Sequence, residues 1–186
     1  MNAPAIVRSC LYDHAQLEVL MDAMARQVAA WSCSRLAVIG ILRRGAPLAD
    51  RLTERLVRHH GMAPPLRLDL SVKRYADDLT LLYPETRLDE NAQHAALNLT
   101  GYCLLVVDDV LYTGHSLLKV VQYLAHKRPT QIRVAVLVDR CVAQMPLHAD
   151  VVGARLQIAP GGIIDCHVPP YEPYFRIELL QPERAP

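Results

Sequence analysis

A short apolar run followed at once by two aspartates is the feature that most constrains the fold of this 186-residue chain. The run covers Leu104–Val107, and Asp108 and Asp109 follow it directly. A parallel strand that is buried on both faces has such a continuous apolar sequence. A turn over residues 110–116 then leads to leucines and valines at helical spacing over residues 117–124. This order of strand, acidic pair, turn and helix predicts an α/β protein with a ligand at the carboxyl ends of its strands.

The turn after the aspartates has the composition of an anion site. The N–H groups at a helix N-terminus bind anions, and Thr113 and Ser116 add hydroxyl donors. Gly114 lets the backbone approach a ligand closely. Two carboxylates beside a phosphate make sense if they accept hydrogen bonds from neutral hydroxyls, as in a ribose, and Mg2+ would reduce the repulsion. We therefore expect a sugar phosphate, although an aspartate helix cap before an ordinary turn is the structural alternative.

Residues 108–114, Asp-Asp-Val-Leu-Tyr-Thr-Gly, resemble the phosphoribosyl pyrophosphate (PRPP) signature of type I phosphoribosyltransferases. They are most similar to the PyrR family, the pyrimidine-operon attenuator proteins with uracil phosphoribosyltransferase activity. The resemblance runs from about Asp13 to Leu180. In that family, the position of His115 is usually Arg and that of Ser116 is usually Thr.

The resemblance implies a type I phosphoribosyltransferase fold, which is an α/β fold. Its sheet is mostly parallel, has helices on both faces and carries a small C-terminal hood. The whole chain, 1–186, would be one domain, with a core at about 13–157, a hood hairpin at about 158–180 and a tail at 181–186. The implied reaction transfers the 5-phosphoribosyl group from PRPP to a nucleobase, uracil, giving UMP and pyrophosphate.

The same resemblance assigns roles to individual residues. Asp108, Asp109 and Arg44 are the expected catalytic residues. Mg2+, the expected cofactor, would be held mainly by PRPP, near the two aspartates. The residues expected to bind PRPP are Asp108, Asp109, Tyr112, Thr113, Gly114, His115, Ser116, Arg43, Arg44, Gly45 and Arg74.

Arg43 and Arg44 of this set follow a second buried strand, predicted at Leu36–Leu42. In the PyrR family the segment after this strand reads Thr-Arg-Gly and binds pyrophosphate, so Arg44 and Gly45 match and Arg43 departs. Arginine can bind pyrophosphate oxygens in a bidentate way. Two solvated surface arginines are the alternative. A helix is expected from about Pro47 to His59.

A long polar connection follows a half-buried strand that contains Leu66, Leu68 and Leu70. It runs from Lys73 to about His94, and loops of this length are usually functional or mobile. The family closes a loop over the active site here. Either Lys73 or Arg74 would grip pyrophosphate, unless the segment is only a surface loop. Asp77 and Asp78 follow no buried strand, which makes them the poorer ribose candidates.

Base recognition is expected near the carboxyl-terminal part of the chain. Asp139 and Arg140 follow a buried strand at Ile132–Val138, and Val152 lies in a last short strand. These three residues are the base-binding candidates, with ordinary structural roles as the alternative. A hairpin of residues 163–168 and 175–180 would form the hood.

The amino-acid composition limits the kinds of partner that the chain is expected to bind. Twenty Lys and Arg balance 19 Asp and Glu, so the chain has no overall basic footprint for nucleic acid. Five dispersed cysteines indicate reduced thiols in a cytoplasmic protein. No segment approaches the roughly 18 apolar residues of a membrane span. The partners that the resemblance implies are PRPP and a nucleobase, and further copies of the chain are expected in a homodimer or higher homo-oligomer.

Two other functions remain open. The first is an RNA-binding attenuator, as in the PyrR family, where the basic RNA surface involves the first helix and the segment after the last long strand. Here the first helix, predicted at about Asp13–Ala30, carries Glu18 and Asp22, and residues 141–144 are uncharged. RNA affinity depends largely on neutralising phosphates, so we expect weak RNA binding. The second is a non-catalytic sensor of PRPP or a nucleotide. Arg51, Arg55 and Arg58 are expected to form one solvated helix face.

Overall fold

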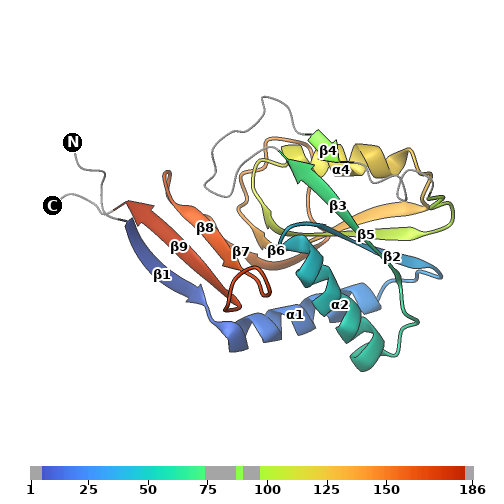
Figure 1. Cartoon of the computed structure of the whole chain (residues 1–186), viewed down its shortest axis with the longest axis horizontal. Coiled ribbons are helices and arrows are strands. Elements are labelled where there is room, and N and C mark those ends of the chain that lie inside the picture. The colour runs from blue at the N-terminus through green and yellow to red at the C-terminus, as the bar shows by residue number, and fades with distance from the viewer. Residues whose placement is uncertain (1–5, 74–86, 90–96, 183–186) are drawn as a thin grey trace.

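The computed structural model describes residues 6–73, 87–89 and 97–182, and within them a six-stranded sheet forms the core (Figure 1). The strand order is β4-β3-β2-β5-β6-β7. Neighbouring strands run parallel except at the β3–β4 edge, which is antiparallel. The predicted mostly parallel sheet is confirmed. Its strands are β2 (Leu36–Leu42), β3 (Leu66–Lys73), β4 (Arg87–Asp89), β5 (Cys103–Leu111), β6 (Gln131–Asp139) and β7 (Val151–Arg155).

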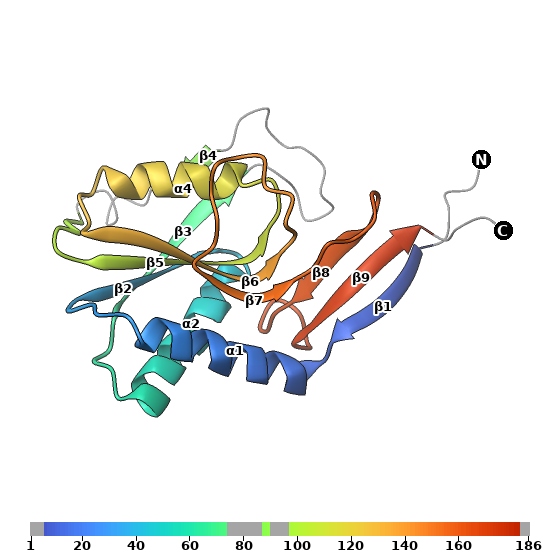
Figure 2. The ribbon, with the colours of Figure 1, turned by 180° about the vertical axis from the view of Figure 1, so that it is seen from behind.

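Helices cover both faces of this sheet, as predicted (Figure 2). Helices α1 (His14–Ala29) and α2 (Gly45–His60) pack on one face, and α4 (His115–Ala125) packs on the other. Side chains of the central strand β5 point alternately to the two faces of the sheet. Leu105 and Val107 pack in the core under α1 and α2, whereas Leu104 and Val106 pack in the core under α4. Burial on both faces explains why the strand is continuously apolar.

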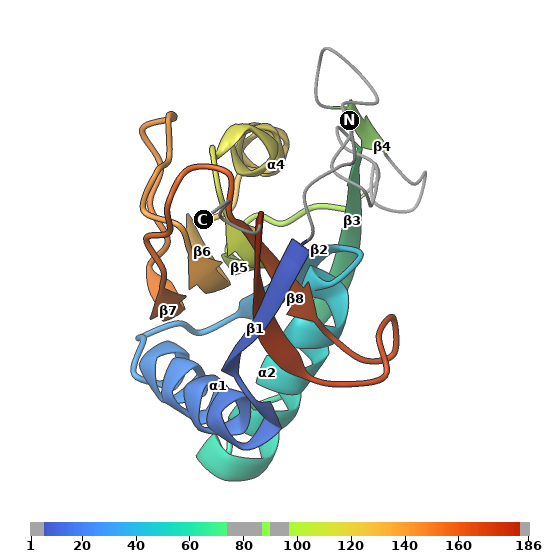
Figure 3. The same cartoon turned by 90° about the vertical axis from the view of Figure 1, so that its left-hand side faces the viewer.

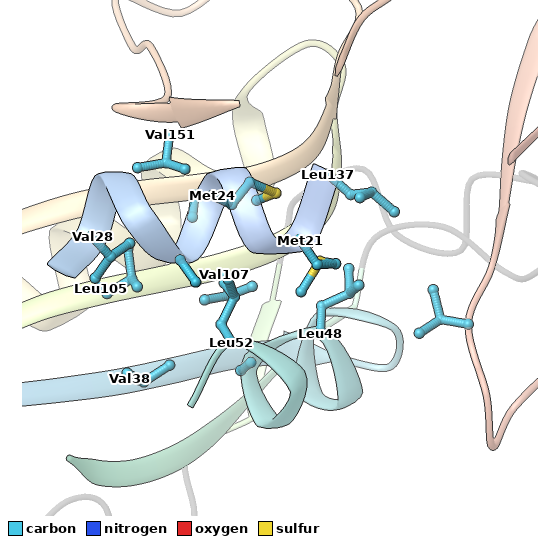
Figure 4. Packing of buried hydrophobic residues seen from close by; sticks show 14 of the residues in the cluster. Met21, Met24, Val28, Val38, Leu48, Leu52, Leu105, Val107, Leu137 and Val151 are labelled. Atoms are coloured by element: carbon cyan, nitrogen blue, oxygen red, sulfur yellow. The ribbon is translucent and has the colours of Figure 1, made fainter. Parts of the chain in front are cut away.

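The core under α1 and α2 is built from long side chains of the helices and branched side chains of the strands. Figure 4 shows Met21 and Met24 on α1, together with Leu48 and Leu52 on α2, directed toward the strands. All four side chains are almost fully buried. They meet residues of β2, β5, β6 and β7, so the first two helices hold the strands that lead to the acidic pair. The labelled strand residues are Val38, Leu105, Val107, Leu137 and Val151.

The helix ends follow local sequence signals. Asp13 caps α1 in a reciprocal box: its Oδ1 accepts from the N–H of Gln16 at 2.9 Å, and its own N–H donates to Oε1 of Gln16 at 2.9 Å. Helix α2 begins at Gly45, two residues before the predicted start, and ends at Gly61 in the left-handed conformation. None of the helices in the described ranges is both long and apolar enough to cross a membrane.

A second sheet forms the hood, with the order β1-β9-β8 (Figure 3). The predicted hairpin is present as β8 (Ile163–His167) and β9 (Arg176–Pro182), which pair antiparallel. The prediction missed β1 (Ile6–Tyr12), which pairs antiparallel with residues 177–182 of β9. Most of β1 is exposed, and its sequence therefore lacks the apolar alternation that identifies a strand.

Candidate functional site

A pocket of about 430 Å3 lies where β5 ends and α4 begins. It combines the acidic pair, the turn after it, one arginine that follows β2, and three hood residues. The lining residues are Arg44, Asp108, Asp109, Val110, Leu111, Tyr112, Thr113, Gly114, His115, Ser116, Leu117, Val136, Arg140, Gly162, Ile163 and Ile164. The structure thus brings together most of the residues that the sequence predicted for PRPP.

The sequence predicted that the two aspartates follow the strand, but the structure places both of them inside β5. The strand continues to Leu111, and both carboxylates line the pocket. Oδ1 of Asp108 accepts from the N–H of Asp109 at 2.9 Å, and Oδ1 of Asp109 accepts from the N–H of Val110 at 3.0 Å. These local hydrogen bonds fix one oxygen of each carboxylate and leave the other oxygen for further contacts.

Burial controls the ionisation of this pair. It raises the pKa of Asp108 well above the ordinary carboxyl value, and the neighbouring charge of Asp109 raises it further. Burial also raises the pKa of Asp109, although the positive charge of Arg44 opposes the effect. Both carboxylates would gain from hydrogen-bond donors or from a cation. Because oxygen ligands suit Mg2+, their chemistry fits a magnesium ion as well as a ribose diol.

The turn after β5 is shaped as an anion site. Gly114 caps α4 with φ of 85°, a conformation that glycine adopts without strain. Nδ1 of His115 lies 3.0 Å from Oγ1 of Thr113, and the carbonyl of Thr113 accepts from the N–H of Gln144 at 3.0 Å. Thr113, Gly114, His115 and Ser116 all line the pocket at the N-terminus of α4. The loop predicted to bind phosphate therefore lies between β5 and α4, with backbone N–H groups at the helix end, and its ligand stays a prediction.

Arg44 reaches the pocket, and carboxylates surround it. Its Nε and Nη2 donate to Oε1 of Glu172 at 3.0 and 2.7 Å. Nη2 also lies 3.4 Å from Oδ1 of Asp165, and Nη1 lies 3.9 Å from Oδ2 of Asp109. Burial lowers the pKa of Arg44, but the hydrogen bond to Glu172 and the acidic neighbours raise it overall, so the side chain stays charged. The sequence did not identify Glu172, which stands alone between prolines in the hood connection.

The two neighbours of Arg44 have other contacts. Arg43 is not among the pocket residues, and its guanidinium lies 5.1 Å from the ring centroid of Tyr171. Gly45 is buried where α2 crosses β5, and a Cβ there would lie 2.4 Å from the carbonyl oxygen of Val107. The close approach of helix and strand is a packing reason for glycine at this position. Its role in binding pyrophosphate stays a prediction.

Of the three base-binding candidates, only Arg140 lines the pocket, where its guanidinium lies 5.0 Å from the ring centroid of Tyr112. The Asp139 carboxylate accepts from the N–H of Cys141 at 2.8 Å and stabilises the turn after β6. Val152 packs against the core under α4. The hood contributes Gly162, Ile163 and Ile164, which sequence reasoning assigned to a hairpin but not to the site.

Most of the segment that was predicted to grip pyrophosphate lies outside the described residues. Arg74, Asp77 and Asp78 lie outside the described residues, and Lys73 is described only as the last residue of β3. The choice between Lys73 and Arg74 stays a prediction.

Solved structures confirm the fold. The chain is similar to hypoxanthine phosphoribosyltransferase of Trypanosoma cruzi, with a TM-score of 0.72 and 20% identity over 94% of this chain and 92% of that one. It is equally similar to the hypoxanthine phosphoribosyltransferase of Staphylococcus aureus, with a TM-score of 0.72 and 16% identity over 94% and 93% of the two chains.

Sequence comparisons give the family. The family model of the phosphoribosyl transferase domain matches residues 8–170. The bifunctional protein PyrR of Thermus aquaticus is 34% identical over 151 residues, which are 81% of this chain and 82% of that protein. The bifunctional protein PyrR of Elusimicrobium minutum is 32% identical over 171 residues, covering 90% and 94%. The family model and the curated relatives agree, and the chain therefore belongs to the phosphoribosyl transferase domain family, as a relative of the bifunctional PyrR proteins.

Proposed function

We propose that this protein transfers the 5-phosphoribosyl group from PRPP to uracil, giving UMP and pyrophosphate. The observation that carries the proposal is the single pocket in which the acidic pair of β5, the loop at the start of α4 and Arg44 converge. These groups match the three parts of PRPP: a ribose diol, a terminal phosphate and a pyrophosphate. The similarity to PyrR proteins supports uracil as the base.

Each part of the pocket has one task in this reaction. The loop of residues 113–116 holds the 5-phosphate through backbone N–H groups and hydroxyls. Asp108 and Asp109 accept hydrogen bonds from the ribose hydroxyls, and Arg44 binds the pyrophosphate. The bond between ribose C1 and the pyrophosphate oxygen breaks, and its electron pair leaves with pyrophosphate. A bond from C1 to the base nitrogen forms as that nitrogen loses its proton. Positive charge that develops on the ribose ring is stabilised by the two carboxylates.

The acidic pair also fits the expected cofactor. Mg2+ would be held mainly by oxygens of PRPP, near Asp108 and Asp109, and would neutralise charge on the departing pyrophosphate. Burial raises the pKa of both carboxyls, and a cation bound nearby would oppose this effect by stabilising their ionised forms. Arg140 and Tyr112, which line the pocket on the side of β6, would contact the base together with Ile163 and Ile164 of the hood.

The test is a screen of PRPP-dependent pyrophosphate release with uracil, hypoxanthine, guanine, xanthine and orotate. We expect turnover with uracil and its loss in Asp109→Asn. Turnover with a purine alone would refute uracil as the base. Thermal melts with PRPP and Mg2+ complete the experiment, because a ligand at a hundred times its dissociation constant stabilises by about 2.7 kcal/mol. A shift without turnover on any base would support a non-catalytic PRPP sensor.

A further inference from the structure

The hood connection and the loop after β2 contact each other through two pairs of neighbouring residues. Tyr171 stacks on Arg43 at 5.1 Å, and the next residue, Glu172, binds Arg44. The connection is anchored at both ends, because Val168 is fully buried and Phe175 is 2% exposed. The N–H groups of residues 171 and 172 both donate to the carbonyl of Val168. The hood thus presents Glu172 on a fixed turn.

Both carboxylate oxygens of Glu172 accept hydrogen bonds. Oε1 accepts from Nε and Nη2 of Arg44 at 3.0 and 2.7 Å. Oε2 accepts from the N–H of Val168 at 2.8 Å. Burial raises the pKa of Glu172, but its hydrogen bonds to Arg44 and Val168 lower it overall, and the carboxylate stays ionised. Glu172 is therefore a charged brace between the hood backbone and one edge of the guanidinium.

The opposite side of the guanidinium is turned toward the pocket. Nη1 lies 3.9 Å from Oδ2 of Asp109, which is too far for a hydrogen bond. Its N–H groups can therefore donate to an incoming oxygen. A guanidinium held at one edge loses less rotational freedom when it binds an anion, so the brace prepares Arg44 for its ligand.

We propose that Glu172 is a positioning residue, which fixes Arg44 so that Nη1 faces the pyrophosphate of PRPP. The inference rests on the proposed function, because it takes pyrophosphate as the ligand of Arg44. The opposite role is physically conceivable: a carboxylate that competes with pyrophosphate for Arg44 would weaken binding. The two roles predict effects of opposite sign when Glu172 is changed.

Glu172→Gln separates them. The glutamine amide has one acceptor oxygen, which can serve Arg44 or the N–H of Val168 but not both. We expect the Kd of Mg2+-pyrophosphate, measured by calorimetry, and the KM of PRPP to rise about tenfold, the effect of losing one charged hydrogen bond. The KM of the base should change by less than about twofold. Glu54→Gln, at an exposed carboxylate that pairs with Arg58 on α2, is the matched control and should leave both constants unchanged.

A double-mutant cycle shows whether Glu172 acts through Arg44. In an Arg44→Ala background, Glu172→Gln should have no further effect on pyrophosphate binding. An equal loss in that background, or tighter pyrophosphate binding in Glu172→Gln alone, would overturn the inference. Glu172→Asp adds a second check: it keeps the charge but shortens the side chain, so positioning predicts a loss and a pure charge effect predicts none.

Binding measurements on the unsubstituted protein separate a failure of the proposed function from a failure of the role proposed for Glu172. If it binds neither pyrophosphate nor PRPP, the proposed function fails, and this inference fails with it. If it binds both and Glu172→Gln binds equally well, only the role of Glu172 is refuted.

Discussion

Asp108 combines a functional position with an unfavourable environment. Its carboxylate is in the pocket beside Asp109, and burial raises its pKa well above the ordinary value. A neutral carboxyl cannot stabilise positive charge on a ribose ring, so the proposed reaction requires the ionised form that burial disfavours. Ligand hydroxyls and a cation would restore that form. We therefore infer that the Asp108 carboxylate lowers the stability of the unliganded protein and acts in the complex with PRPP.

Asp108→Asn should stabilise the unliganded protein and lower its turnover. Because the pKa is raised on folding, the folded state binds the proton more tightly, and the associated stability is complete below the unfolded pKa. It is lost as pH rises through the folded value, so the substitution should matter most at neutral to alkaline pH. We expect Tm to rise by about 2–4 °C at pH 8, which corresponds to ~1 kcal/mol.

Turnover of Asp108→Asn should fall by about ten- to a hundredfold, the cost of one charged contact. Calorimetric melts from pH 5 to 8 and steady-state kinetics on the same preparations test both effects. A variant that melts lower than the starting protein at pH 8, or one with undiminished turnover, would contradict this interpretation of Asp108.

At the scale of elements, an ion-pair network joins the first two helices. Arg55 of α2 is 8% exposed, and its Nε lies 2.8 Å from Oδ1 of Asp22 on α1. Glu18 of α1 pairs with Arg55 and, at 2.9 Å, with Nη1 of Arg51. The prediction that Arg51, Arg55 and Arg58 form one solvated face is therefore wrong for Arg55. The sequence shows three arginines at helical spacing, but only tertiary packing brings α1 against them.

Arg55→Ala should lower the free energy of unfolding by about 1–3 kcal/mol. Asp22 loses its ion pair with Arg55, Glu18 keeps only Arg51, and the buried arginine stem leaves a gap. Arg58→Ala is the control on the same helix. Its side chain is exposed and pairs only with Glu54 at 2.6 Å among the described residues, so its loss should cost less than ~0.5 kcal/mol. Urea unfolding measures both values, and equal costs would show that the α1–α2 network contributes little.

At the scale of the whole molecule, the charge distribution argues against an RNA regulator. The net charge is +1 with histidines neutral. The acids of α1 that replace the expected basic residues are engaged by Arg51 and Arg55, so these arginines are not free to neutralise phosphates. Binding through six to ten phosphate contacts needs a basic stripe and loses about 10³–10⁵ in affinity between 50 and 200 mM salt.

We therefore expect weak or undetectable binding to pyrimidine-operon leader RNA, despite the similarity to PyrR proteins. Filter binding with leader RNA from the organism's own operon tests this, titrated with salt and with UMP. A scrambled RNA of the same length is the control. Nanomolar binding that depends on UMP and falls steeply with salt would restore the attenuator as the main function.

Local sequence was sufficient to predict the features of this protein that depend only on residues close together in the chain. The apolar runs predicted β2, β5 and β6, because strands buried on both faces must be apolar throughout. Asp13 predicted the start of α1, because capping involves only residues a few positions apart. The acidic pair and the loop of residues 113–116 identified the pocket for the same reason: their chemistry is contiguous in sequence.

Tertiary structure alone decided what depends on contacts between distant segments. The pairing of β1 with β9 joins residues near the two chain ends, and no local pattern announces it. Glu172 meets Arg44 across 128 positions of sequence, so only the folded hood shows that the pyrophosphate-loop arginine has a carboxylate partner. Likewise, only the crossing of α2 over Val107 shows the packing reason for glycine at position 45. The sequence determined which groups the site contains, because that depends on neighbouring residues; the fold decided which groups touch, because that depends on packing.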